Sequence, residues 1–193
     1  EETVMPERKI SKKSLENLTI SNRESNRLTR ESLEISLLQL LEKKELAKIT
    51  ISELVNRAGV SRASFYRNYS SKEEILEELF GQIVHNIMEK MAQFDFKTEL
   101  YQVWLALFKE AQKEAHLIRL AVEYNLEKHL TQAVFNFLEK GQESKKDASS
   151  YVNSFWSSAL VSVLSKWIKE GMKVPAEKIA ALGMPLFPQK KKK

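Results

Sequence analysis

The sequence contains no cysteine, and glycine and proline are scarce, with 5 and 4 among 193 residues. The absence of cysteine excludes thiol catalysis, thiolate-bound zinc, iron–sulfur clusters and a disulfide-stabilised secreted scaffold. So few glycines and prolines argue against a β protein with many tight turns. The longest apolar runs are a few residues, far short of the roughly 20 that span a bilayer, and the N-terminus lacks an apolar signal core. We therefore expect a cytoplasmic protein of one or two domains.

Sequence patterns of catalysis are also missing. His85, His116 and His129 are the only histidines, and none lies in a His-Glu-x-x-His arrangement. The sequence has neither a glycine-rich phosphate loop nor a Gly-x-Ser-x-Gly nucleophile elbow. We therefore expect no enzyme activity, no catalytic residues, no cofactor and no metal site.

The charge that is present is unevenly distributed along the chain. There are 31 Lys and Arg against 26 Asp and Glu, a net charge of +5. Residues 5–72 carry 14 cations and 8 Glu, whereas residues 73–189 carry 13 cations and 16 acidic residues. A basic N-terminal third before a neutral-to-acidic remainder predicts a polyanion-binding domain on a body with another role. A solvated helical protein without such a partner shows similar imbalances, so charge alone leaves both interpretations open.

Helical patterns begin near residue 30. Residues 1–28 are polar without an apolar period, which predicts an extension that is disordered or locally helical. Leucines at helical spacing then predict a first helix over about residues 30–45: Leu33, Leu37, Leu38, Leu40 and Leu41. Thr50-Ile51-Ser52-Glu53 and Ser71-Lys72-Glu73-Glu74 are capping boxes, in which hydroxyl and carboxylate satisfy each other's backbone amides. They predict the starts of a short helix ending at Ala58 and of a long helix.

A third short helix is predicted between these two. Gly59 follows Ala58 where a helix ends in the left-handed conformation, and Ser61 caps a helix from Arg62 to about Tyr69. Phe65 and Tyr69 must pack inward, which leaves a polar face made of Arg62, Ser64, Tyr66, Arg67 and Asn68. Two helices joined by a tight glycine turn, the second displaying hydrogen-bonding side chains, are typical of a helix-turn-helix that reads the major groove. An αα-corner with a polar surface is the alternative.

These residues also resemble a known family. The segments Ile51-Ser52-Glu53-Leu54, Ala58-Gly59-Val60-Ser61, Phe65-Tyr66-Arg67-Asn68-Tyr69 and Ser71-Lys72-Glu73 resemble the N-terminal domain of TetR-family transcriptional regulators over about residues 30–80. The resemblance implies that the exposed side of the third helix faces DNA, at Arg62, Ala63, Ser64, Tyr66 and Asn68. It also implies that Ser52 approaches the groove and that Lys72 holds a phosphate, and Arg67 completes the predicted set. Asn68 and Tyr69 depart from the more usual His and Phe, so no operator sequence transfers with the resemblance.

The remaining chain predicts further helices from about residue 97 to 188. This region resembles, less specifically, the C-terminal ligand and dimerisation domain of the same family. A polar loop is expected at 140–146, a helix at 148–170 ending at Gly171, and a last helix from Pro175 to about Leu182. Five aromatic residues form either simple core or the lining of a ligand cavity: Trp104, Phe108, Tyr124, Phe155 and Trp156. A strip of serines on helix 148–170 predicts close approach at a dimer interface formed by Phe155, Ser158, Leu160, Ser162 and Trp167.

Together these patterns predict an all-α protein, with an N-terminal three-helix helix-turn-helix DNA-binding domain joined by a long helix to a C-terminal helical ligand-binding and dimerisation domain. The predicted boundaries are a flexible basic extension at 1–28, the helix-turn-helix domain at 29–75, the C-terminal domain at 76–188 and a lysine-rich tail at 189–193. We expect a homodimeric repressor that a small-molecule effector releases from a palindromic operator. The alternative is an activator, or a protein-interaction module whose C-terminal domain binds a protein partner.

The N-terminal extension has two interpretations of equal standing. It is either a solvated tail or an arm that reaches the phosphate backbone or minor groove beside the recognition helix. Its cations, with those at the start of the first helix, are Arg8, Lys9, Lys12, Lys13, Arg23, Arg27 and Arg30. Deleting residues 1–28 distinguishes the two, because removing cations that bind phosphate reduces the salt dependence of DNA binding.

Overall fold

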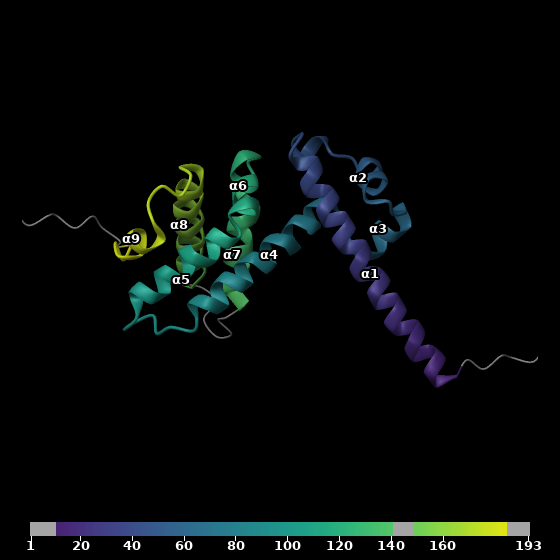
Figure 1. The fold of residues 1–193 in the computed structure, drawn as a ribbon, viewed down its shortest axis with the longest axis horizontal. Helices are drawn as coiled ribbons and strands as arrows, with labels where there is room; N and C mark the ends of the chain where they lie inside the picture. The colour runs from purple at the N-terminus through teal and green to yellow at the C-terminus, as the bar shows by residue number, and fades with distance from the viewer. Residues whose placement is uncertain (1–10, 141–148, 185–193) are drawn as a thin grey trace, which may run out of the picture. The chain divides into compact units, whose positions relative to one another are not determined.

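The computed structural model describes residues 11–140 and 149–184, and all regular secondary structure in these ranges is helical (Figure 1). The all-α class predicted from the sequence is confirmed. The chain divides into two compact units between Lys72 and Glu73. None of the helices in the described ranges combines the length and the apolarity required to cross a bilayer.

The first unit consists of one long helix and two short ones. Helix α1 covers Lys12–Leu41, the 3₁₀ turn η1 covers Leu46–Lys48, α2 covers Ile51–Ala58 and α3 covers Arg62–Asn68. The leucines of the C-terminal half of α1 recur at helical spacing, and α1 packs on both α2 and α3. The most deeply buried side chains of this small core are Leu33, Leu37, Leu41, Ile49, Leu54, Phe65 and Tyr69. Burial of this apolar face holds two short helices that would be unstable alone.

Helix α1 begins at Lys12, well before the start predicted near residue 30, and it ends at Leu41. The sequence left residues 1–28 open between disorder and local helix, and from Lys12 onward the chain is helical. The added turns lack an apolar period, but extending an existing helix is far easier than nucleating one. The guanidinium of Arg27 also lies 3.6 Å from Glu24 and 3.8 Å from Glu31, pairs that favour a helix. Residues 1–10, with Arg8 and Lys9, lie outside the described residues.

The second unit is a bundle of helices. Helix α4 covers Lys72–Met91 and thus starts at the last residue of the first unit; it is followed by α5 (Leu100–Lys113), α6 (Ala115–Glu123), α7 (Glu127–Lys140), α8 (Ser149–Lys169) and α9 (Ala176–Ala180). Helix α8 packs on α5, α6 and α7, and α9 packs on α5.

The ends of α8 and α9 agree closely with the sequence. Gly171, with φ of 76°, follows the end of α8, and Pro175 precedes the first residue of α9. The predicted polar loop at 140–146 lies almost wholly outside the described residues, as does the lysine-rich tail.

Candidate nucleic-acid interface and apolar cavity

The turn between α2 and α3 is determined by local backbone chemistry. Thr50 caps α2, its hydroxyl accepting a hydrogen bond from the amide of Glu53 at 3.2 Å. At the other end Gly59 adopts φ 67° and ψ 26°, and the amides of Gly59 and Val60 donate to the carbonyls of Asn56 and Val55. This is a Schellman ending, which needs a residue that tolerates the left-handed conformation. The ending sets the point from which α3 starts.

Helix α3 separates a buried side from an exposed one. The hydroxyl of Ser61 accepts from the amide of Ser64 at 3.0 Å, which caps the helix. Phe65 and Tyr69 have exposed fractions of 0% and 2%, so they anchor α3 to the core, whereas Tyr66 is 56% exposed. The remaining predicted DNA-binding residues of α3 are exposed at Arg62, Ala63 and Arg67 and half-buried at Ser64 and Asn68. The face has the composition that suits recognition of base edges and phosphates.

Hydroxyl groups position the polar side chains of this face. An Nη1 hydrogen of Arg62 is donated to Oγ of Ser52 at 3.3 Å, which brings together a predicted contact on α2 and one on α3. Arg67 donates to Oγ of Ser64 at 2.9 Å, and Asn68 donates from Nδ2 to the Ser64 carbonyl at 2.8 Å. These partners are neutral, so the charges of Arg62 and Arg67 stay available to a polyanion.

Lys72 has a structural role that the sequence did not reveal. Its Nζ donates to the carbonyl oxygens of Leu46 and Ile49, at 2.6 Å each. The ammonium therefore ties the 3₁₀ turn η1 to the start of α4. An ammonium has three hydrogens, so one remains for the predicted phosphate contact.

Arg30 and Glu34 extend the site onto α1, and sequence analysis missed their connection to α3. Arg30 donates to the carbonyl of Asn68 at 3.2 Å, and the hydroxyl of Tyr69 lies 3.1 Å from a carboxylate oxygen of Glu34. A cation at the last carbonyls of a helix satisfies unpaired acceptors and complements the helix dipole. The spacing of Arg30 and Glu34, one helical turn apart, is the signal that could have indicated their shared face.

Glu53 is an acid whose pKa is shifted by its neighbours in this unit. Lys44 Nζ lies 2.6 Å from its carboxylate, and this hydrogen bond is the main cause that lowers the pKa of Glu53 below its ordinary value of 4.5. The backbone amide of Thr50 lowers the pKa further, as expected of a capping box. The pair ties the segment after α1 to the first turn of α2.

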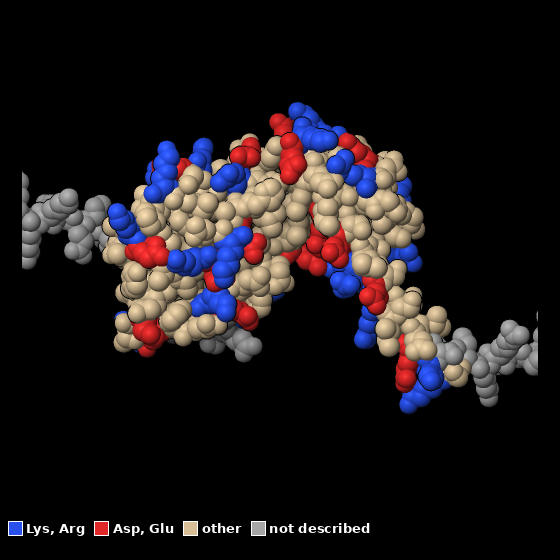
Figure 2. All heavy atoms as spheres, in the orientation of Figure 1, with Lys and Arg blue, Asp and Glu red and all other residues tan. Residues whose placement is uncertain are grey.

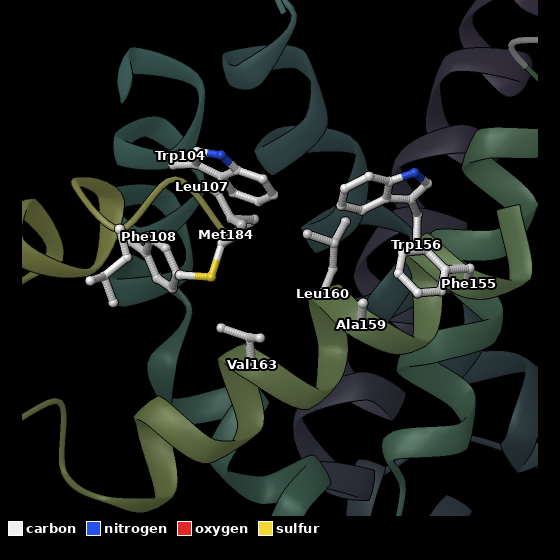
Figure 3. Close-up of a pocket in the computed structure, with 10 residues that line it drawn as sticks. Trp104, Leu107, Phe108, Phe155, Trp156, Ala159, Leu160, Val163 and Met184 are labelled. Carbon is white, nitrogen blue, oxygen red and sulfur yellow. The ribbon is translucent and has the colours of Figure 1, made fainter. Parts of the chain in front are cut away.

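The second unit contains an apolar cavity of about 530 Å³ between α5, α8 and the residues after α9 (Figure 3). Trp104 on α5 and Trp156 on α8 approach each other across it, with ring centres 6.3 Å apart. The lining residues are Trp104, Leu107, Phe108, Phe155, Trp156, Ala159, Leu160, Val163, Leu182 and Met184. Four of the five aromatic candidates line this cavity, whereas Tyr124, after the end of α6, does not. Its volume is in the range typical of small-molecule sites.

The five residues predicted for a dimer interface occupy two different sides of α8. Phe155, Ser158 and Ser162 are exposed. Leu160 and Trp167 are only 8% and 4% exposed within the single chain. Trp167 donates from Nε1 to the carbonyl of Val174 at 2.7 Å and meets the Phe108 ring edge-on. These two residues stabilise the unit's own core, so the predicted interface narrows to Phe155, Ser158 and Ser162.

The fold and this geometry define a helix-turn-helix unit followed by a helical second unit. The family model for bacterial regulatory proteins of the tetR family matches residues 37–79. A model for a transcriptional regulator C-terminal region matches residues 98–186. The chain belongs to the TetR family of DNA-binding transcriptional regulators.

Individual relatives agree with this assignment. The uncharacterized HTH-type transcriptional regulator YxbF of Bacillus subtilis (strain 168) is 26% identical over 162 residues, which are 79% of this chain and 42% of that protein. The chain spans about half the length of the curated relatives it matches. Among solved structures, Lin0861 from Listeria innocua aligns with a TM-score of 0.64 at 16% identity, over 81% of this chain and 87% of that one. A TetR transcriptional regulator from Streptococcus agalactiae 2603V aligns with a TM-score of 0.57 at 20% identity, over 86% and 96%. These likenesses show a shared fold.

Proposed function

We propose that the protein is a homodimeric repressor that binds a near-palindromic operator and that a small apolar effector releases it. The observation that carries the proposal is the exposed, hydroxyl-positioned face of α3, held by a buried Phe65 and Tyr69 behind it. The site belongs to a single small unit, so it presents a rigid helix to the major groove.

On this proposal α3 reads the bases and its neighbours position it. Arg62 suits the O6 and N7 acceptors of a guanine, and the methyl group of Ala63 suits contact with a thymine methyl. Tyr66, one turn after Arg62, contacts the next base or its phosphate. Ser52, Arg67 and Lys72 contact the backbone and hold α3 at its depth in the groove.

The dimer forms through the outer side of α8. Ser158 and Ser162 are small and exposed, so two copies of α8 approach closely about a two-fold axis, with Phe155 at the border of the contact. The same axis relates two copies of α3. Two such helices read successive major grooves when they are about 34 Å apart, which makes the operator a near-palindrome.

The effector acts from the apolar cavity through the core of the second unit. Leu107 and Leu160 line the cavity, and they also line a small void beside Ile83, Val84 and Ile87 of α4. A ligand that moves either leucine therefore presses on α4, the helix that begins at Lys72. The effector binds more tightly to a state of the dimer in which the two α3 helices no longer match the spacing of the major grooves. Operator affinity falls by the ratio of the effector's affinities for the two states.

Selection of DNA from a random pool by the purified full chain tests the proposal. The expected result is an enriched near-palindrome with half-sites about 10 base pairs apart or a multiple of this. Apolar aromatic compounds that raise the melting temperature of the second unit should then weaken binding to the selected sequence. Failure to enrich any sequence overturns the proposal. Enrichment without any small molecule that responds supports the protein-partner alternative, and increased transcription from the bound site supports an activator.

A further inference from the structure

The N-terminal part of α1, which begins at Lys12, extends past the part of the helix that α2 and α3 cover (Figure 1). From Glu16 to Leu28 every side chain of this extended segment is exposed. Such a run of exposed helix does not contribute to the core, and it forms a surface that a partner molecule can reach.

One side of the extended segment carries a line of basic and hydrogen-bonding residues. At 100° per residue, Lys12, Arg23 and Arg30 fall within about 20° of one line along α1. Thr19 lies about 20° from this line, and Asn26 and the acidic Glu16 lie about 40° from it on opposite sides. We call this set, Lys12, Thr19, Arg23, Asn26 and Arg30, the basic stripe.

The basic stripe continues the side of α1 that faces α3. Leu37 and Leu41, which are 0% exposed in the core, lie within about 20° of the same line further along the helix. Residue Arg30, where the stripe begins, contacts the carbonyl of Asn68 at the end of α3. This side of α1 is therefore apolar where α2 and α3 pack on it and cationic before that point, and the change occurs beside the recognition helix.

The two outer cations of the stripe, Lys12 and Arg23, are not neutralised by neighbours. No carboxylate among the described residues lies within ion-pair distance of either, whereas the off-stripe Arg27 is close to both Glu24 and Glu31. Both signs of charge occur along α1, as Figure 2 shows from one direction. The excess of cations is therefore a property of the basic stripe and not of the whole helix.

We propose that the basic stripe binds the phosphate backbone of DNA that flanks the half-site read by α3. The proposal rests on the proposed DNA-binding function and adds a second contact surface to it. Lys12 and Arg30 are separated by about 27 Å along the helix, so the stripe spans several phosphates beyond the major groove that α3 enters. Lys and Arg bind phosphate without reading sequence, and Thr and Asn add hydrogen bonds to the same oxygens.

The test compares two charge-matched double variants of the full chain on the selected operator. Lys12→Gln/Arg23→Gln removes two cations from the stripe, and Lys13→Gln/Arg27→Gln removes two from other sides of the same helix. Glutamine preserves helix propensity, and circular dichroism checks that the helix remains. The slope of log affinity against log salt should become shallower by about 1.8 per chain in the first variant, because each of the two phosphates no longer bound contributes about 0.9. Affinity at 0.1 M salt should fall on the order of 10-fold or more.

Operator length gives an independent readout. Trimming the duplex to the two half-sites should weaken the unmodified protein but leave the Lys12→Gln/Arg23→Gln variant unchanged, because only the flanking phosphates are removed. Equal losses in both double variants, or no change in either, overturn the proposal. So does a loss of dimerisation in place of DNA affinity, which would mean that a second copy covers the stripe. If the stripe proposal is overturned but Arg62→Ala still abolishes operator binding, the proposed DNA-binding function holds and only the role of the stripe is wrong. Failure to select any operator overturns both proposals.

Discussion

The guanidinium carbon of Arg30 lies 4.8 Å from the centre of the Tyr69 ring. A cation of α1 thus covers the face of the aromatic residue that ends the helix-turn-helix, while the same guanidinium donates to the carbonyl of Asn68. Arg30 thus makes two interactions of different kinds with two successive residues, Asn68 and Tyr69, at the C-terminal end of α3. Arg30 therefore helps to determine the orientation of the recognition helix as well as its stability.

Replacing Arg30 should loosen α3 selectively. Arg30→Met keeps the length and helix propensity of the side chain but removes the cation–π contact and the hydrogen bond. We expect the opening free energy of α3, measured by amide hydrogen exchange, to fall by about 1–2 kcal/mol. Arg27→Met is the matched control, since its exposed ion pairs should contribute at most about 0.5 kcal/mol. Equal effects of the two variants would contradict the role assigned to Arg30.

Arg62 and Lys72 should differ in the kind of DNA affinity that they support. Arg62→Ala is expected to cost about 1–3 kcal/mol and to relax preference at particular base pairs, because we propose that Arg62 binds a base edge. Lys72→Ala should weaken all sequences alike and also destabilise the first unit, since Nζ holds the carbonyls of Leu46 and Ile49. Repeating the DNA selection with each variant measures this directly. Uniform weakening by Arg62→Ala would remove it from the base-reading set.

The ion pair between Lys44 and Glu53 makes the stability of the first unit dependent on pH. The pKa of Glu53 is lower in the folded state than its ordinary value of 4.5, so the contribution is present above pH 4.5 and is lost as the pH falls through the folded pKa. Glu53→Gln should therefore destabilise the unit at pH 7, and the difference should shrink below pH 4.5. Thermal unfolding at several pH values checks this, and a difference that stays constant into acid would exclude the ion pair as its source.

Filling the cavity should separate DNA binding from its regulation. Ala159 faces the cavity between Phe155 and Val163, so Ala159→Phe occupies part of its volume with a ring. We expect a protein that binds the operator normally but no longer responds to effector. The exposed Ala92, which does not line the cavity, gives the control Ala92→Phe, which should respond like the unmodified protein. A variant that still releases DNA at the same effector concentration would place the effector elsewhere.

The outer side of α8 should determine the oligomeric state. Ser158→Glu places a charge at the centre of the proposed contact and should dissociate the dimer, as sedimentation at micromolar concentration would show. Operator affinity should fall with it, because one copy of α3 reads only one half-site. Lys169→Glu, at the far end of α8, is the control for added negative charge. A protein that is monomeric before any substitution, with its fold intact, would refute this interface.

The helix-turn-helix was predictable because its signals are local. The hydroxyl of Thr50, the left-handed Gly59 and the cap at Ser61 act within a few residues, so their order in the chain predicts both helices and the turn. The part of α1 before residue 30 was not predictable in the same way, since its few apolar side chains, such as Leu18, Ile20 and Leu28, are exposed and periodicity detects only buried faces.

The remaining differences depend on neighbours distant in sequence. Lys72 looked like a free phosphate ligand because the carbonyls that it binds, at Leu46 and Ile49, are 23 or more residues away. Leu160 and Trp167 share α8 with the exposed Ser158, and only the packing of α5, α6 and α7 on α8 shows which side each residue occupies. Helical spacing predicts which residues share a face of a helix. Which element packs on that face depends on the tertiary structure.

Helix α8 presents Ala159 and Val163 to the cavity and Ser158 and Ser162 to the outer surface, and this division has an evolutionary consequence. Residues that shape the cavity, such as Ala159 and Val163, are free to change without altering the serine side, so ligand preference can diverge while the assembly is retained. Phe155 is the exception, because it lines the cavity and is also 51% exposed. Among lineages that adapt to new ligands, Phe155 should be the cavity position that changes least often, or that changes together with its counterpart on the partner surface.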